Sequence, residues 1–246
     1  MKLHMSIPKI FFWILTLSIV YMIFSSSFFN VLYDKDLFAR EAEEFGTGES
    51  VERPLAKFQH LVLYFLNDDE YLQQPDSIFS DQRFSENELE HYKDVKDIIS
   101  TVKTVYFAAF IAFIVLITGF SSSLLMKYND RSTLKEKFAL FFIKLQLSVL
   151  AVSALLLIVL AVPGLFAFQD SFNLFHEALF PQGNYRFPPD SLSMMLFPQE
   201  FFIDFFIEVL LDVLGFVLML AVLFGFVYVL YRIRKRRRVP AAKDAE

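Results

Sequence analysis

The chain contains four long apolar stretches that carry no charged side chain. They cover residues 10–32, 104–126, 145–168 and 213–231. Because the hydrocarbon core of a bilayer is about 30 Å thick, about 20 apolar residues in a helix are enough to cross it. Lipid offers no hydrogen-bond partners to an open backbone, so spans of this kind form helices. The pattern predicts an all-α membrane protein with four transmembrane helices.

The segments between these spans differ in charge. Residues 34–100 contain 17 acidic and 7 basic residues, and residues 169–200 contain 4 acidic and 1 basic. In contrast, the short connection 127–137 and the tail 232–246 are rich in Lys and Arg. Basic residues near span ends remain in the cytoplasm. We therefore expect cytoplasmic termini and a small extracytoplasmic cap built from two discontinuous loop segments, 34–100 and 169–200.

Two segments allow another interpretation. The first span follows Lys2 and Lys9 and resembles the apolar region of a signal peptide, but its 23 residues exceed the usual length of about 7–15. An uncleaved anchor is favoured. The basic tail has the composition of a site for anionic lipid or nucleic acid, but a topology anchor explains it more simply, and we expect no nucleic-acid partner.

The composition agrees with a membrane protein and restricts its chemistry. Of 246 residues, 55% are hydrophobic and 17% aromatic, more than a soluble domain of this size usually buries. The absence of cysteine excludes a disulfide scaffold, a Cys-ligated metal and a Cys nucleophile. The sequence also lacks the Gly-x-Ser-x-Gly motif of many hydrolases, so an acyl-enzyme of that kind is not indicated.

His91 is the first candidate for catalysis. Ser85 and Glu88 have the spacing of a capping box, and neither Gly nor Pro interrupts the chain from there to Gly119. A helix is therefore expected to begin at Ser85 and to run into the second span. Asp94 follows His91 at i+3, where a carboxylate can accept a hydrogen bond from imidazole. Both an oriented general base and an exposed His–Asp pair fit this spacing.

His176 is the second candidate. Residues 170–180 are expected to form a short helix that begins at a capping residue, Asp170, and ends before Pro181. Phe172, Phe175 and Leu179 share one face of it, as in a helix lying in the membrane interface. This places His176 at the depth of lipid ester bonds. The alternative is an aromatic anchor whose histidine faces water.

The turn that follows concentrates polar groups beside His176. Its candidates for supporting roles are Asn184, Arg186 and Asp190. Loops held by a rigid scaffold often carry function, although this composition also suits an ordinary turn.

The sequence is compatible with two other kinds of site. Asp204, Glu208 and Asp212 recur every four residues, so they lie along one helical face and suggest a transporter or an accessory protein if they lie within the bilayer. An outer extension of the fourth span that projects above the bilayer is the favoured explanation of these acids. His91 and His176 together with Asp94 or Asp97 suggest a metal site, but no third ligand has suitable spacing, so we expect none.

Two sequence signatures resemble a known family. Residues 84–96, FSENELEHYKDVK, are similar to the signature before the second span in the bacterial integral membrane proteins of the lipoprotein intramolecular transacylase family. A second signature resembles residues 175–180, FHEALF, followed by GNYRF, Asp190 and FPQEFF. The sequence departs from the family at Tyr92, where Met is commoner, and at Tyr185, where Trp is expected.

The resemblance implies an enzyme of the bacterial cell membrane. Its reaction moves the sn-2 acyl chain of the diacylglyceryl group on a lipoprotein to the α-amino group of the lipoprotein's own N-terminal cysteine, which gives a lyso-form lipoprotein. The family histidines match His91 and His176. The implied partners are diacylglyceryl-modified bacterial lipoproteins and membrane lipid, with no cofactor and with the active site at the outer leaflet.

His91 is expected to lie far from the start of the second span, and this interpretation has to account for the distance. A straight helix places His91 about 20 Å beyond Thr104 at about 1.5 Å per residue. We therefore expect either a bend in the helix or an outer pocket that lifts the lipid headgroup.

Overall fold

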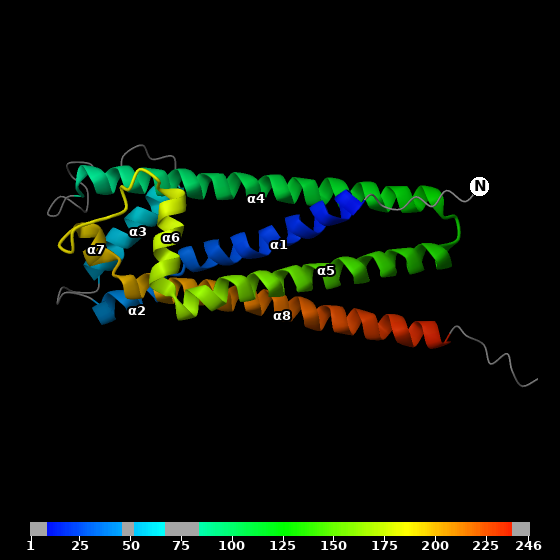
Figure 1. Cartoon of the computed structure of the whole chain (residues 1–246). Helices are drawn as coiled ribbons and strands as arrows, with labels where there is room; N and C mark the ends of the chain where they lie inside the picture. Colours follow the sequence, from blue (N-terminus) through cyan, green and yellow to red (C-terminus); the bar gives the residue numbers. More distant parts are fainter. Residues whose placement is uncertain (1–8, 46–51, 67–83, 238–246) are drawn as a thin grey trace, which may run out of the picture. The chain divides into compact units, whose positions relative to one another are not determined.

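A computed structural model describes residues 9–45, 52–66 and 84–237. The predicted cap segment 34–100 therefore lies partly outside the described residues, as do Lys2 and the end of the basic tail. The described residues form helices and no strand (Figure 1), which confirms the predicted all-α class. The helices are α1 (Lys9–Leu32), α2 (Lys35–Phe45), α3 (Glu52–Leu66), α4 (Glu86–Lys127), α5 (Arg131–Phe166), α6 (Phe168–Leu179), α7 (Leu192–Leu196) and α8 (Gln199–Arg237).

Four helices are long and apolar enough to cross a membrane; three of them contain a whole predicted span, and the fourth contains most of one. They are α1, α4, α5 and α8. The third stretch was predicted to extend to residue 168, but α5 ends at Phe166 because Ala167 leaves the helical conformation with φ −144° and ψ 48°. As predicted, α4 runs from the capping box into the second apolar stretch without interruption.

The chain divides into two compact units. The first comprises Met1–Ile23, Ala108–Leu157 and Val213–Glu246, and the second comprises Phe24–Phe107 and Ile158–Asp212. In the first unit, α4 and α5 meet through the stacked rings of Phe120 and Phe141, and Gln146 on α5 donates to the carbonyl oxygen of Leu220 on α8. All the candidate site residues belong to the second unit.

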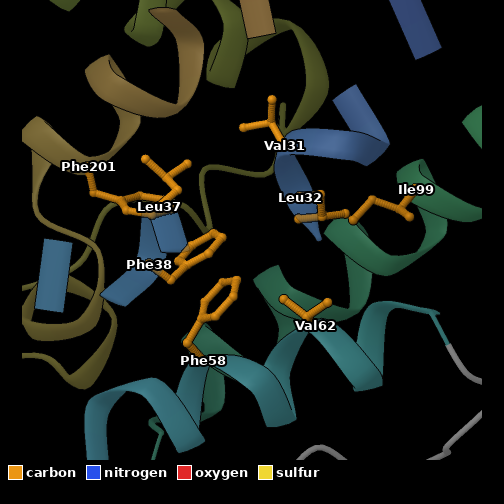
Figure 2. Packing of buried hydrophobic residues seen from close by; sticks show 8 residues of the cluster. All are labelled: Val31, Leu32, Leu37, Phe38, Phe58, Val62, Ile99 and Phe201. Carbon is orange, nitrogen blue, oxygen red and sulfur yellow. The ribbon is translucent and has the colours of Figure 1, made fainter. Parts of the chain in front are cut away.

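The second unit has an apolar core to which five helices contribute. Figure 2 shows Phe38 of α2 and Phe58 of α3 with their rings stacked at its centre. The other members are Val31, Leu32, Leu37, Val62, Ile99 and Phe201. Burying side chains of this size stabilises the fold by about 1.5–3 kcal/mol each. This core ties the end of α1, the first half of α4 and the start of α8 to α2 and α3.

The start of α4 is fixed by the predicted capping box. The hydroxyl oxygen of Ser85 accepts from the Glu88 amide at 3.3 Å, and Glu88 accepts from the Ser85 amide at 2.7 Å. Phe84, just before the cap, packs in one cluster with Leu89. This is the hydrophobic staple that sets the direction in which the chain enters a helix.

Glu88 also joins α4 to α7. The amide of Ser193 donates to Glu88 at 2.7 Å, and the hydroxyl of Tyr92 donates to the Ser193 hydroxyl oxygen at 2.9 Å. Helix α7 begins after Ser191, whose side chain accepts from the Met194 amide. This short helix was not predicted.

The first testable consequence concerns Glu88. Replacing this buried carboxylate with Gln leaves one of its backbone donors facing an amide NH₂ group, so the free energy of unfolding is expected to fall by about 1–3 kcal/mol. Thermal unfolding of the detergent-solubilised protein measures the change. Glu86→Gln in the same helical turn is the control, because Glu86 is exposed. Equal melting temperatures for the two variants would contradict the role of Glu88.

Candidate functional site

His91 lies on α4 before the charge-free apolar stretch begins at Thr104. The capping box at Ser85 fixes the helix start, so the rotational position of His91 on α4 is fixed as well. Its side chain points into the second unit and is 8% exposed. The interpretation of His91 as part of an exposed pair on a solvated helix is therefore wrong.

His176 lies on α6, which begins at Phe168, two residues before the predicted Asp170. Its Nδ1 lies 2.8 Å from the carbonyl oxygen of Phe172, one helical turn earlier. A carbonyl oxygen only accepts, so Nδ1 carries the hydrogen and Nε2 of the neutral ring has a free lone pair. His176 is 8% exposed, whereas Leu174 and Phe175 of the same helix are largely exposed. The alternative in which His176 merely faces water is also wrong.

The two histidines lie together although they are 85 positions apart in the sequence. Their ring centroids are 6.1 Å apart and the ring planes differ by 25°. Phe180 contacts both rings, with centroid distances of 4.5 Å to His91 and 5.6 Å to His176. Tyr185 lies against His176 at 5.0 Å, and Phe187 lies against His91 at 5.4 Å. The imidazoles therefore share a largely aromatic environment.

The turn that carries these aromatic residues is held to α4 by Asp94. One oxygen of Asp94 accepts from the side-chain amides of Gln182 at 2.6 Å and of Asn184 at 2.7 Å. Gly183 lies between them with φ +81°, a backbone conformation that residues with a Cβ rarely adopt. Its amide donates to the carbonyl oxygen of Phe180 and closes the turn.

The expected hydrogen bond between His91 and Asp94 is not formed. Nδ1 of His91 is buried and has no hydrogen-bond partner among the described residues. The i+3 spacing brings the two side chains to one side of α4, but the amide donors of the turn take the carboxylate. Asp94 therefore acts on the pKa of His91 through space, without a hydrogen bond to the ring.

Arg186 and Asp190 differ from Asn184 in their positions. The Arg186 side chain is 74% exposed, lies over the ring of Tyr185 and donates to its hydroxyl oxygen at 3.3 Å. It also pairs with Glu177 at 3.6 Å. Arg186 is thus connected to His176 through Tyr185. Asp190 is exposed, and no contact within the described part of the chain joins it to either histidine.

The electrostatic environment keeps both imidazoles neutral. Burial is the main cause that lowers the pKa of His91 to about 4, and the adjacent His176 lowers it as well. Asp94 and Asn184 act in the opposite direction and are outweighed. Burial also lowers the pKa of His176, against the effect of its bond to Phe172. At neutral pH both rings are therefore available to accept protons.

The acidic face on α8 forms polar contacts with other helices of the second unit. Glu208 pairs with Arg40 of α2 at 3.1 Å, and Asp212 accepts from the side-chain amide of Asn30 of α1 at 3.2 Å. These bonds give two of the acids a structural role in joining α8 to α1 and α2. In the described residues, no group of three or more His, Cys, Asp or Glu side chains is arranged to hold a metal ion.

Sequence reasoning missed three parts of the site. Gln182 is not a sequence candidate, because no local signal relates it to Asp94. The Ser193 contact with Glu88 was missed for the same reason. The Phe172 carbonyl, in contrast, lies at i−4 from His176 on a predicted helix, and this spacing was sufficient to find it.

Comparisons with known proteins agree on one family. The family model described as lipoprotein intramolecular transacylase Lit matches residues 5–202. The in meso structure of the membrane integral lipoprotein intramolecular transacylase Lit from Bacillus cereus is similar, with a TM-score of 0.72 and 22% identity over 92% of this chain and 97% of that chain. Two Bacillus cereus variants in which a histidine is replaced by Arg or Ala have TM-scores of 0.68 and 0.67 with 23% identity, and cover 92% of this chain and 94% and 95% of theirs. No curated protein matches the sequence.

The titration of His91 gives the second testable consequence. Its ring should stay neutral down to about pH 4 in the folded protein, and His176→Gln should raise this midpoint because a neighbouring positive charge is removed. Ring ¹⁵N and ¹³C chemical shifts of histidine-labelled protein in detergent measure both midpoints. A midpoint near 6.5 in the unmutated protein would contradict the burial argument.

The lowered pKa of His91 also makes the free energy of unfolding depend on pH. An unfolded histidine titrates near pH 6.5, so the unfolded chain binds the proton first as the pH falls. The contribution of His91 to the free energy of unfolding is present in full above about pH 6.5 and is lost as the pH falls towards about 4. His91→Gln should make the acid-induced loss of stability smaller.

Proposed function

Because the chain belongs to the family of the lipoprotein intramolecular transacylase Lit, we propose that it moves an acyl chain within a bacterial lipoprotein. The acyl group leaves the sn-2 position of the diacylglyceryl group and joins the α-amino group of the lipoprotein's N-terminal cysteine. The product is a lyso-form lipoprotein. The observation that best supports this function is the pair of buried, neutral imidazoles 6.1 Å apart.

The number of protons transferred explains why two bases are useful. An α-ammonium group, with a pKa of about 7.7–8.0, must lose one proton before its nitrogen can attack the ester carbonyl carbon. When the C–N bond forms, the nitrogen loses a second proton. The breaking C–O bond leaves an alkoxide that takes one proton, and the other is released to solvent. Two protons thus leave one nitrogen, and two imidazoles lie together to receive them.

We assign the general base to His176. Its Nδ1 is bonded to the Phe172 carbonyl, so its Nε2 accepts a proton while the ring orientation remains fixed. Once protonated, the ring is an acid that can donate to the leaving alkoxide. His91 accepts the other proton from the same nitrogen and helps to hold it near the ester.

The supporting residues have distinct roles in this mechanism. The Nδ2 group of Asn184 is bonded to Asp94, so we assign stabilisation of the developing oxyanion to the exposed guanidinium of Arg186. Asp94 holds the turn, and Asp190 faces solvent beside it. The amine and the ester belong to one molecule, so holding both in a near-attack geometry accounts for much of the rate enhancement.

His91 lies beyond the predicted span, so the ester of the substrate has to leave the bilayer to reach it. A row of aromatic rings offers an apolar path for the attached acyl chain. Phe206 of α8 contacts Phe168, Phe168 contacts Phe172, and Phe172 lies 4.0 Å from His176. These residues connect the first part of α8, before its charge-free stretch, with the site. We propose that an acyl chain follows this row when its ester rises to the histidines, while the exposed Leu174 and Phe175 face the outer leaflet.

Replacement of either histidine tests the function. In cells that make a diacylglyceryl lipoprotein and this protein, His91→Gln or His176→Gln should reduce the N-acylated lyso form at least about 100-fold, because each removes a proton acceptor. Mass spectrometry of the N-terminal lipopeptide measures the product. His60→Gln on α3 is the matched control and should leave the yield unchanged. Undiminished product from both site variants would refute the assignment.

The topology has its own test, which uses the absence of cysteine. Asn87→Cys at the start of α4 should react with a membrane-impermeant maleimide in intact cells, because we place this segment outside the cell. Asn129→Cys, between α4 and α5, should react only after permeabilisation. Both side chains are exposed, so accessibility of the residue does not limit either reaction. The opposite labelling pattern would reverse the proposed orientation.

A further inference from the structure

Two of the buried side-chain atoms that lack a hydrogen-bond partner in the described residues belong to neighbouring groups of the site. They are Nδ1 of His91 and Oδ1 of Asn184. His91 is 8% exposed and Asn184 is 6% exposed, so water does not readily satisfy either atom. Buried polar atoms of this kind usually have partners.

The orientation of the Asn184 side chain follows from its bond to Asp94. A carboxylate accepts hydrogen bonds and does not donate them, so the group that faces Asp94 is the NH₂ of Asn184. Its Oδ1 therefore points away from Asp94. The side chain of Asn184 raises the pKa of His91 against the effect of burial. An oxygen acceptor near the ring has this effect, and an NH₂ donor does not.

We propose that Asp94 and Asn184 act as a positioning pair that fixes the tautomer of His91. Asn184 Oδ1 accepts from Nδ1–H of His91, and Nε2 is left with its lone pair. The tautomer itself does not depend on the proposed function, but its role in catalysis rests on that function. Both imidazoles of the site then have the same tautomer, since His176 is fixed through the Phe172 carbonyl. Nε2 of His91 and Nε2 of His176 then each carry a lone pair, and the two lone pairs can accept from the two N–H groups of one α-amine.

Placing the side-chain amide of Asn184 between Asp94 and His91 has a physical advantage over a direct hydrogen bond between Asp94 and the ring. A carboxylate bonded to the ring would stabilise the imidazolium form and oppose the burial that keeps His91 neutral. A neutral amide selects the tautomer, and Asn184 raises the pKa of His91 less than the charge of Asp94 does. Asp94 fixes the amide in turn, so the turn at residues 180–184 and the His91 ring are positioned by one group.

Ring ¹⁵N spectra of the substrate-free protein test the tautomer directly, because protonated and unprotonated ring nitrogens have different shifts. His91 should show protonated Nδ1 and unprotonated Nε2 at pH 7. Asn184→Leu, which removes the acceptor, should give a mixture of tautomers. Gln182→Leu is the matched control: it removes the other bond to Asp94 and should leave the His91 tautomer unchanged. Protonated Nε2 on His91 in the unmutated protein would overturn the proposal.

A second variant separates positioning from simple support of the turn. Asn184→Asp keeps an oxygen acceptor for Nδ1 but adds a charge, so the pKa of His91 should rise by about 1–3 units, as expected of an opposite charge in contact. A purely structural role predicts a lower melting temperature with no change in this midpoint, and that result would also overturn the proposal. These spectra require no turnover. If the tautomer is as proposed but His91→Gln retains full transacylase activity, the proposed function fails and the positioning pair stands.

Discussion

Two carboxylates on α4, Glu88 and Asp94, hold the segment between α6 and α8, and His91 lies between them in the sequence. A carboxylate removed from water is stable only when donors surround it. Glu88 is almost fully buried, and burial alone would raise its pKa. Its bonds with Ser193 and Ser85 outweigh this effect and lower the pKa, so it remains charged. Asp94 takes its donors from Gln182 and Asn184. Satisfying these two charges therefore brings the turn after His176 against the helix that carries His91.

The chemistry of the site depends on the same packing. Aromatic rings exclude water from the imidazoles and thereby lower the pKa values, so both proton acceptors remain free at neutral pH. The same exclusion favours an amine over water as the nucleophile, because water that is absent cannot hydrolyse the ester. In the proposed reaction, the nucleophile comes from the lipoprotein, which agrees with a chain that has no cysteine of its own.

The sequence was a good guide wherever local spacing determines structure. Hydrophobic runs located α1, α4, α5 and α8, and the Ser85–Glu88 spacing located the start of α4. It was a poor guide to contacts between distant segments. The i+3 spacing suggested that Asp94 would bind His91, yet donors 88 and 90 positions away bind it instead. Periodicity along one helix carries no information about such competitors. The histidines could be paired in advance only through the family resemblance.

The two departures from the family pattern lie around the imidazoles and not at them. Tyr92 replaces an expected Met, and its hydroxyl donates to Ser193, a bond that a thioether cannot make as a donor. This adds a second hydrogen bond between the start of α4 and α7 to the one that Glu88 accepts from the Ser193 amide. Tyr185 replaces an expected Trp, and its ring still lies against His176 while its hydroxyl binds Arg186. Packing at position 185 requires a large aromatic ring. The polar group that this ring carries can differ, because it contacts Arg186 and not an imidazole. The imidazoles lack this freedom, because the proposed chemistry requires a nitrogen lone pair at each position.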